Sequence, residues 1–435
     1  MLNAKKILPL FLAVLSASCS GTKDLPQGKR ISVIDVPELS FQASNKNANF
    51  ALSEAANVEN WSQVASNERH QNQNLLMAKQ TQKRWTADFG TGSSKRNLLL
   101  ASPVVQNGII YTQDADGTVK AFDLKNGDRI FKQKLKPLNQ NDAASGLNGA
   151  GLAVQGKKLY AVAGFGGVFA LDALNGNILW RQDFGTPIRT APTVASGTLY
   201  IQTINNQLIA LSTNDGSEMW RYNISAEDTI FAGGAVPAAD AEKQIVINAF
   251  SNGDLQAFNA KIGYPIWLQD LINTNFAPSA IHALKASPVI EKGIVYAAGN
   301  NDKTVAVNIE TGELIWQMPF SGMSTPLVDK EALFMVTNNH ELLALSKENG
   351  QLLWQTPLLD DMSLKDRRTV YIFSPLLIND KLLIATSNGW LLRFNAKTGA
   401  FLSEDFAGEN LAVGPIVASG NLILTTESAK LIVFK

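Results

Sequence analysis

The chain has 435 residues, a length that accommodates two or three average domains or one large repetitive all-β fold. Hydrophobic residues make up 45% of it and charged residues 17%, which excludes a disordered protein and allows a large core. Lysine plus arginine and aspartate plus glutamate both number 38, so no global positive field attracts phosphate backbones, and we expect no nucleic-acid partner.

The N-terminus has the order of a secretory signal. Lys5 and Lys6 precede an apolar run at residues 7–15, and small residues at 16–18 precede Cys19. The run is shorter than the roughly 20 apolar residues that a membrane-spanning helix needs. Cys19 is the only cysteine, and its place resembles a bacterial lipobox, in which the cysteine carries a lipid. We expect a signal peptide at residues 1–18 and lipidation of Cys19. The alternative is an ordinary signal with an incidental cysteine nearby.

Residues 19–80 are predicted to form a lipid-anchored tether and lead-in. They are rich in Asn, Gln, Ser, Ala and Lys and show little apolar alternation. Trp61 is an exception, and we expect it to dock against the folded domain. Ser20 stands where lipoproteins retained at the inner membrane have aspartate, so the lipobox resemblance implies a lipid-anchored protein at the periplasmic face of the outer membrane.

One repeat dominates residues 81–435. Each copy has a strand of alternating apolar residues, a turn that ends in glycine, and an aromatic residue four positions later. The period of about 40 to 50 residues is that of propeller blades. The turn glycines are Gly127, Gly176, Gly216, Gly263, Gly312, Gly350 and Gly399. The aromatic residues are Phe131, Trp180, Trp220, Trp267, Trp316 and Trp354, and Ser403 replaces the aromatic in the last copy.

Short strands open the units in the same phase, and all but one of these starts contain proline. Proline is tolerated at a strand start because its missing N–H is not needed in the ladder there. The eight starts are Ser102-Pro103, Gly151-Leu152, Ala191-Pro192, Val236-Pro237, Ser287-Pro288, Thr325-Pro326, Ser374-Pro375 and Gly414-Pro415. The prediction is an all-β fold, an eight-bladed β-propeller of four-stranded antiparallel blades.

The eighth unit lacks its fourth strand in sequence order. Residues 431–435 supply its third strand, and no glycine and tryptophan follow. Residues 84–90, which include Trp85, match residues 179–185 nearly residue for residue. We therefore predict that the N-terminal strand completes the last blade and closes the ring, which removes the open sheet edges.

The recurring aromatic residues, Trp85 included, are predicted to be structural. A residue present in every repeat is needed by every repeat, and each ring is expected to fill the interface between neighbouring blades. The glycine that precedes it is expected to supply the positive φ of the turn.

The pattern Ala-(Leu/Phe)-Asp-x-x-x-Gly-x-x-x-Trp, fullest at residues 170–180, resembles the repeat of pyrroloquinoline-quinone propellers. Combined with the signal, Cys19, Trp61 and the N-terminal strand, it resembles the BamB family, lipoproteins of the outer-membrane β-barrel assembly (BAM) complex. The resemblance implies a non-enzymatic scaffold that binds the periplasmic domains of BamA and other BAM components. It also implies a role in the assembly and insertion of β-barrel proteins, with contact to unfolded outer-membrane proteins as an option.

One pair of candidate partner-binding residues follows from this resemblance. The family has an apolar residue and an arginine in a loop before an Ala-Pro strand start, and Ile188 and Arg189 precede Ala191-Pro192 in that order. An apolar anchor beside an arginine is a common hot-spot pair. An ordinary interblade loop is the alternative.

No constellation of catalytic residues stands out. His70, His282 and His340 fall in the lead-in and in two different units, and a single cysteine leaves no thiolate set for a metal or haem. Hydrolase and phosphate-loop motifs are missing from the sequence. We expect no catalytic residue, no metal and no cofactor. The alternatives are a pyrroloquinoline-quinone-dependent dehydrogenase, which needs its cofactor and a divalent cation in the channel, and a periplasmic ligand-binding propeller.

Overall fold

The computed structural model describes residues 50–78, 82–95, 97–137, 151–188, 190–225, 233–272, 284–300, 302–359 and 369–435. All of them belong to one compact unit that spans residues 41–435. Thirty-two strands form eight four-stranded antiparallel sheets within these ranges. No helix in the described part of the chain is long and apolar enough to cross a membrane.

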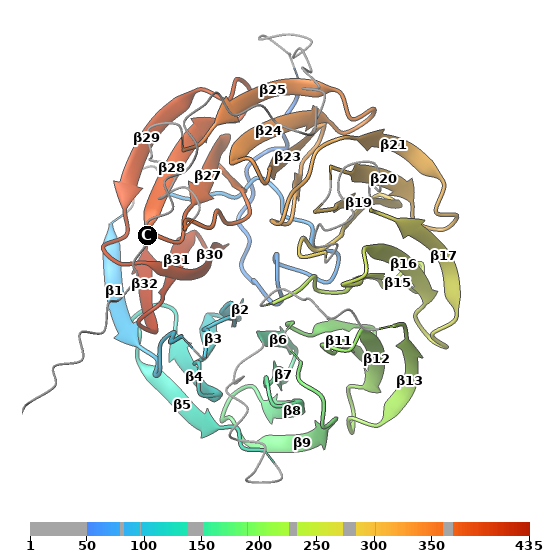
Figure 1. The fold of residues 1–435 in the computed structure, drawn as a ribbon. Coiled ribbons are helices and arrows are strands. Elements are labelled where there is room, and N and C mark those ends of the chain that lie inside the picture. Colours follow the sequence, from blue (N-terminus) through green and yellow to red (C-terminus); the bar gives the residue numbers. More distant parts are fainter. Residues whose placement is uncertain are drawn as a thin grey trace, which may run out of the picture. The chain divides into compact units, whose positions relative to one another are not determined.

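The eight sheets are the blades of a propeller and follow one another around a ring in chain order (Figure 1). In blades 1 to 7 the first strand lies nearest the axis and the fourth lies at the rim. Blade 1 contains β2 (Val104–Gln106), β3 (Ile109–Gln113), β4 (Thr118–Asp123) and β5 (Arg129–Lys134). Blade 2 contains β6 (Gly151–Gln155), β7 (Lys158–Val162), β8 (Gly167–Asp172) and β9 (Ile178–Asp183). Blade 3 contains β10 (Thr193–Ala195), β11 (Thr198–Gln202), β12 (Gln207–Ser212) and β13 (Glu218–Asn223). Blade 4 contains β14 (Ala238–Asp240), β15 (Ile245–Ala249), β16 (Asp254–Asn259) and β17 (Pro265–Asp270).

The other four blades continue the ring. Blade 5 contains β18 (Val289–Glu291), β19 (Ile294–Ala298), β20 (Thr304–Asn308) and β21 (Leu314–Met318). Blade 6 contains β22 (Leu327–Val328), β23 (Ala332–Val336), β24 (Glu341–Ser346) and β25 (Leu352–Pro357). Blade 7 contains β26 (Leu376–Ile378), β27 (Lys381–Ala385), β28 (Trp390–Asn395) and β29 (Phe401–Phe406). Blade 8 contains β30 (Leu411–Ala418), β31 (Asn421–Thr426), β32 (Lys430–Phe434) and β1 (Lys83–Asp88).

The eight-bladed all-β fold predicted from the repeat is confirmed. Each predicted start lies at an innermost strand. Pro415 differs from the other prolines because it lies inside β30, at an irregularity between Val413 and Ile416, and not before the strand. An irregular register there leaves room for a residue that has no N–H to donate.

Closure by the N-terminal strand is also confirmed. β1 is antiparallel to β32, and Trp85 pairs with Val433. The backbone N–H of Gln82 donates to the carbonyl oxygen of Lys435 at 2.8 Å, and the N–H of Lys435 donates back at 2.9 Å. Blade 8 is therefore built from two distant parts of the sequence, and the ring has no open edge at this point.

Each repeat aromatic residue joins its own blade to the next one. The indole N–H of Trp180 in blade 2 donates to the carbonyl oxygen of Thr213 in blade 3 at 3.1 Å. The same ring covers Gly216, where an added Cβ would lie 2.5 Å from Trp180 Cε3. The turn glycine, with φ of +75°, thus serves two purposes, because the positive φ and the close approach of the indole both exclude a side chain. The other pairs are Trp85–Gly127, Phe131–Gly176, Trp220–Gly263, Trp267–Gly312, Trp316–Gly350 and Trp354–Gly399.

Residues 50–78, which we call the belt, correct the prediction of a tether for this stretch. The belt runs through the middle of the ring (Figure 1) and hydrogen-bonds to every blade. Its partners are Ser419 for Val58, Val105 for Trp61, Val154 for Ser62, Val194 for Gln63, Ala239 for Glu68, Ile290 for Arg69, Leu377 for Leu75 and Asp329 for Ser53.

The belt follows the axis because the innermost strand of each blade has a free edge there. The first strand of a blade has one edge that no other strand of its sheet covers, and its backbone N–H and C=O groups need partners. Trp61 supplies both, because its N–H donates to Val105 at 2.8 Å and its carbonyl oxygen accepts from Val105 at 2.7 Å. Trp61 as a whole is 3% exposed, so the predicted docking of this residue is confirmed. The polar composition of the belt reflects hydrogen bonding to the blades and does not indicate a free chain.

Candidate functional site

A cavity of about 630 Å³ lies on the propeller axis. Because every innermost strand starts near the axis, the residues just before those strands converge there. The walls carry apolar side chains and hydroxyl groups from blades 1 and 3 to 8, and Val64 of the belt contributes to the lining. The belt binds the inner strands at their middle residues and ends, whereas the cavity is lined mainly by residues that precede those strands.

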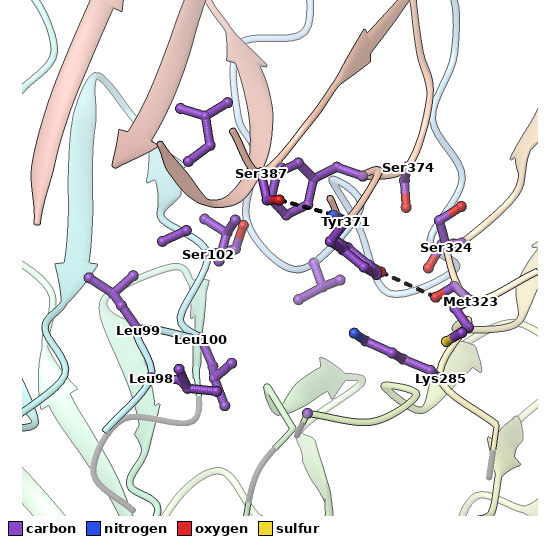
Figure 2. Close-up of a pocket in the computed structure, with 18 of the residues that line it drawn as sticks. Leu98, Leu99, Leu100, Ser102, Lys285, Met323, Ser324, Tyr371, Ser374 and Ser387 are labelled. Atoms are coloured by element: carbon purple, nitrogen blue, oxygen red, sulfur yellow. Dashed lines mark hydrogen bonds between the residues drawn. The ribbon is translucent and has the colours of Figure 1, made fainter. Parts of the chain in front are cut away.

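Lys285 and Tyr371 form the polar centre of this axial cavity (Figure 2). Lys285 precedes blade 5, and its Nζ lies 4.1 Å from the centroid of the Tyr371 ring, which precedes blade 7. An ammonium over an aromatic face is stabilised by the ring quadrupole. Burial lowers the pKa of Lys285 and raises the pKa of Tyr371 to about 12, so the tyrosine is neutral at physiological pH.

Tyr371 is fixed in place by its neighbours. Its backbone N–H donates to Ser387 Oγ at 2.9 Å, and its hydroxyl donates to the carbonyl oxygen of Met323 at 3.4 Å. Phe373 meets its ring edge-on with the centroids 5.3 Å apart. These three contacts fix the orientation of the Tyr371 ring, and with it the ring face that Lys285 approaches.

The charge balance of the axial cavity is uneven. Lys285 and Glu427 are the charged residues among the described residues of its wall, and they come from blades 5 and 8. Glu427 accepts a hydrogen bond from Asn410 Nδ2 at 3.3 Å. Within the described ranges, Lys285 has no carboxylate within ion-pair distance. Among the residues that the structure describes, the arrangement around Lys285 is suited to holding an anion.

A second hollow, of about 710 Å³, lies between blades 7 and 8. Its lining includes Ser403, Arg393, Asp405 and Leu422, together with the end of the belt at residues 76–78. Arg393 and Asp405 form an ion pair across β28 and β29. This hollow marks the interface at which the repeat aromatic residue is replaced by serine.

Of the two predicted partner-binding residues, the structure describes only Ile188. Ile188 is fully buried, forms an isolated bridge with Thr203, and packs with Val194 and Leu199. Its side chain lies in a buried cluster shared by blades 2 and 3 and is not displayed to a partner. Arg189 lies outside the described residues, so a contact role for it stays a prediction.

Some of the other predicted site residues lie outside the described ranges, and the structure places the rest. Cys19 and the signal peptide lie outside the described residues, as does His282. Trp85, Phe131, Trp180, Trp220, Trp267, Trp316 and Trp354 all lie at blade interfaces. In the part of the chain that the structure describes, no three His, Cys, Asp or Glu side chains gather as a metal-binding group.

No motif in the sequence points to the axial cavity or to its centre. Lys285 and Tyr371 belong to no motif and are 86 residues apart in the sequence. The eight strand starts were nevertheless a usable signal, since residues just before inner strands must face the axis of a propeller. The strand starts therefore indicate which segments line the cavity, but they do not indicate which side chains meet there.

Comparison with known proteins adds a family relation. The model of the family described as outer membrane protein assembly factor BamB matches residues 115–356 and 338–435. The outer membrane protein assembly factor BamB of Moranella endobia is 26% identical over 353 residues, which cover 79% of this chain and 87% of the relative. That of Salmonella typhimurium is 28% identical over 348 residues, with coverage of 78% and 85%.

Solved structures show the same fold at lower identity. The crystal structure of BamB from Moraxella catarrhalis has a TM-score of 0.65 at 16% identity and covers 82% of this chain and 98% of its own. A europium-containing methanol dehydrogenase has a TM-score of 0.70 at 13% identity, with coverage of 86% and 98%. At such identities the likeness establishes the propeller architecture alone.

Proposed function

The chain belongs to the BamB family of outer membrane protein assembly factors, and from that premise we propose that it is a non-enzymatic scaffold of the BAM complex. In this role it binds the periplasmic domains of BamA and aids the insertion of β-barrel proteins. The observation that carries the proposal is the family match, which extends through most of the propeller.

The construction of the ring supports a scaffold. Blade 8 is closed by β1, the belt hydrogen-bonds to all eight blades, and each interface is joined by an aromatic residue or, between blades 7 and 8, lined by the Arg393–Asp405 pair. A ring tied at its rim, interfaces and axis presents its loops in fixed relative positions, as a docking surface requires.

The location is part of the proposal. Lipidation of Cys19 would hold the propeller at the periplasmic face of the outer membrane, beside the domains that it binds. Metabolic labelling with a fatty acid, followed by its loss in a Cys19→Ser variant, tests the anchor separately from partner binding.

The binding test uses the full chain in detergent and the periplasmic domains of BamA from the same organism. We expect saturable binding in biolayer interferometry. Arg189→Glu is the informative variant because Ile188 is buried, and truncating Ile188 would disturb blade 3. Arg181→Glu, at an exposed position on β9, is the matched control. Binding that is unaffected by Arg189→Glu removes this residue from the interface, and no binding by the wild type contradicts the scaffold proposal.

A further inference from the structure

The axial cavity contains a cation in an apolar setting. Leu98, Leu99 and Leu100 line it from blade 1, and Lys285 lies on the opposite side of the view in Figure 2. Leu98 is 44% exposed although it is a large apolar side chain. An exposed leucine and a half-buried lysine in one cavity are each unfavourable alone, and one ligand with an apolar part and a negative charge satisfies both.

Three hydroxyl groups on the wall of the axial cavity accept backbone N–H groups. Ser387 Oγ accepts the N–H of Tyr371, Ser287 Oγ accepts the N–H of Val236 at 3.0 Å, and Thr325 Oγ1 accepts the N–H of Ser287 at 3.2 Å. A hydroxyl that accepts a backbone N–H keeps its own O–H to donate. Three hydroxyls and an ammonium on the wall of one cavity thus have protons that they can donate to a ligand.

Ser324 adds an independent observation. It is 5% exposed, and its Oγ has no hydrogen-bond partner among the described residues. A buried hydroxyl without a partner is unusual in a folded protein and calls for a partner from elsewhere. Ser324 lies on the cavity wall next to Met323, which holds the Tyr371 hydroxyl.

We propose that the axial cavity is a binding site for a small organic carboxylate with an apolar body. The carboxylate accepts hydrogen bonds from the ammonium of Lys285 and from hydroxyls of the cavity wall in blades 5 to 7. The apolar body packs against Leu98 and Leu100. Glu427 lies in blade 8, away from the lysine, and disfavours a ligand with a second negative charge at that end of the cavity. The site is independent of the scaffold role, since it needs no protein partner.

The test uses 3-phenylpropionate as the probe, 3-phenylpropionamide as its neutral counterpart, and isothermal titration calorimetry on the full chain in detergent. We expect one saturable site per chain for the carboxylate. The amide should bind about ten-fold more weakly or worse, because a charge-assisted hydrogen bond is replaced by a neutral one. Equal binding of both probes, or no saturable binding up to about 10 mM, overturns the proposal.

Variants locate the site on the propeller. Lys285→Met keeps the length of the side chain and removes the charge, and it should weaken carboxylate binding at least about ten-fold. Lys285→Arg should retain binding, and Lys261→Met, at an exposed position in blade 4, should have no effect. Thermal unfolding of each variant verifies that it is folded.

A second readout covers the case in which Lys285→Met does not fold. After reductive ¹³C-methylation, the Lys285 dimethylamine signal, identified by its loss in Lys285→Arg, should titrate at higher pH when 3-phenylpropionate is bound. An unchanged titration in the presence of saturating probe contradicts a contact between the carboxylate and Lys285.

Discussion

Arg393 on β28 lies directly opposite Ser403 on β29, at the cross-strand position where blades 1 to 6 pair an alanine with the repeat aromatic residue. In blade 7 the large side chain is on the third strand and the small one on the fourth, which is the reverse of the order in blades 1 to 6. In the other blades the aromatic ring covers the turn glycine of the next blade. Blade 8 has no such turn, because its third and fourth strands are β32 and β1. Ser403 is therefore a consequence of closing the ring with an N-terminal strand.

Restoring the aromatic residue at this position should not help. We expect Ser403→Trp to leave the melting temperature unchanged or to lower it, because the ring would face Arg393 and would have no glycine turn to cover. Differential scanning calorimetry of the variant measures the effect. An increase of several degrees would show that the hollow between blades 7 and 8 accepts an indole, and that this explanation of Ser403 is wrong.

The interblade tryptophans should each contribute strongly to stability. Trp180→Ala removes a ring that fills the interface between blades 2 and 3 and the hydrogen bond to Thr213, and we expect a loss of about 3–5 kcal/mol in the free energy of unfolding. Trp390→Ala is the control, since Trp390 is 39% exposed and should cost much less. Urea unfolding measures both, and equal losses would contradict a special role for the repeat position.

The side chain of Gln63 takes the place of a neighbouring strand's backbone at the free edge of β10. Its amide donates to the carbonyl oxygen of Val194 at 2.9 Å and accepts the N–H of Val194 at 2.8 Å. Gln63→Leu leaves both backbone groups buried without partners, so a loss of about 1–3 kcal/mol is expected. Hydrogen exchange at the Val194 amide should accelerate in this variant. The exposed Gln73→Leu is the control, and slow exchange at Val194 in both proteins would argue against the belt as a partner of the inner strands.

His70 should make the belt sensitive to acid. It is 1% exposed, its Nδ1 is 2.9 Å from the carbonyl oxygen of Pro288, and burial lowers its pKa to about 4. With the ring neutral, Nδ1 donates to that carbonyl. As the pH falls below about 6.5, the unfolded chain binds a proton that the folded chain refuses, so stability is lost between about pH 6.5 and pH 4, up to roughly 3 kcal/mol.

His70→Gln removes this proton linkage while keeping a donor for Pro288. We expect the variant to be less stable than the wild type at pH 7.5, with the difference in melting temperature narrowing at pH 4.5. A difference that stays constant over this range would mean that His70 is not held neutral in the folded protein.

Features that recur in every blade could be predicted from the sequence, whereas features that occur once in the chain could not. The blade number, the strand starts, the closure by Trp85 and its neighbours, and the structural role of the aromatic residues all follow from period and phase. The belt has no period, and its polar side chains resemble those of a disordered segment until the inner strand edges are in view. The prediction for Ile188 rests on a short motif, and a short motif does not distinguish an exposed isoleucine from a buried one such as this.

The axial cavity shows the same limit. Lys285 and Tyr371 approach each other because the ring brings the starts of blades 5 and 7 to the axis. A sequence read without a fold gives no reason to pair them, whereas the propeller prediction alone already indicates that both lie near the axis.

The most direct test of the central claim is purification of the tagged full chain from detergent-solubilised envelopes of its own organism, with mass spectrometry of the proteins that accompany it. A tagged, unrelated outer-membrane lipoprotein serves as the control. We predict that BamA and other BAM components are enriched with the propeller and not with the control. A folded propeller that is recovered from the envelope without BamA would contradict the scaffold role and leave the family relation as one of fold and ancestry.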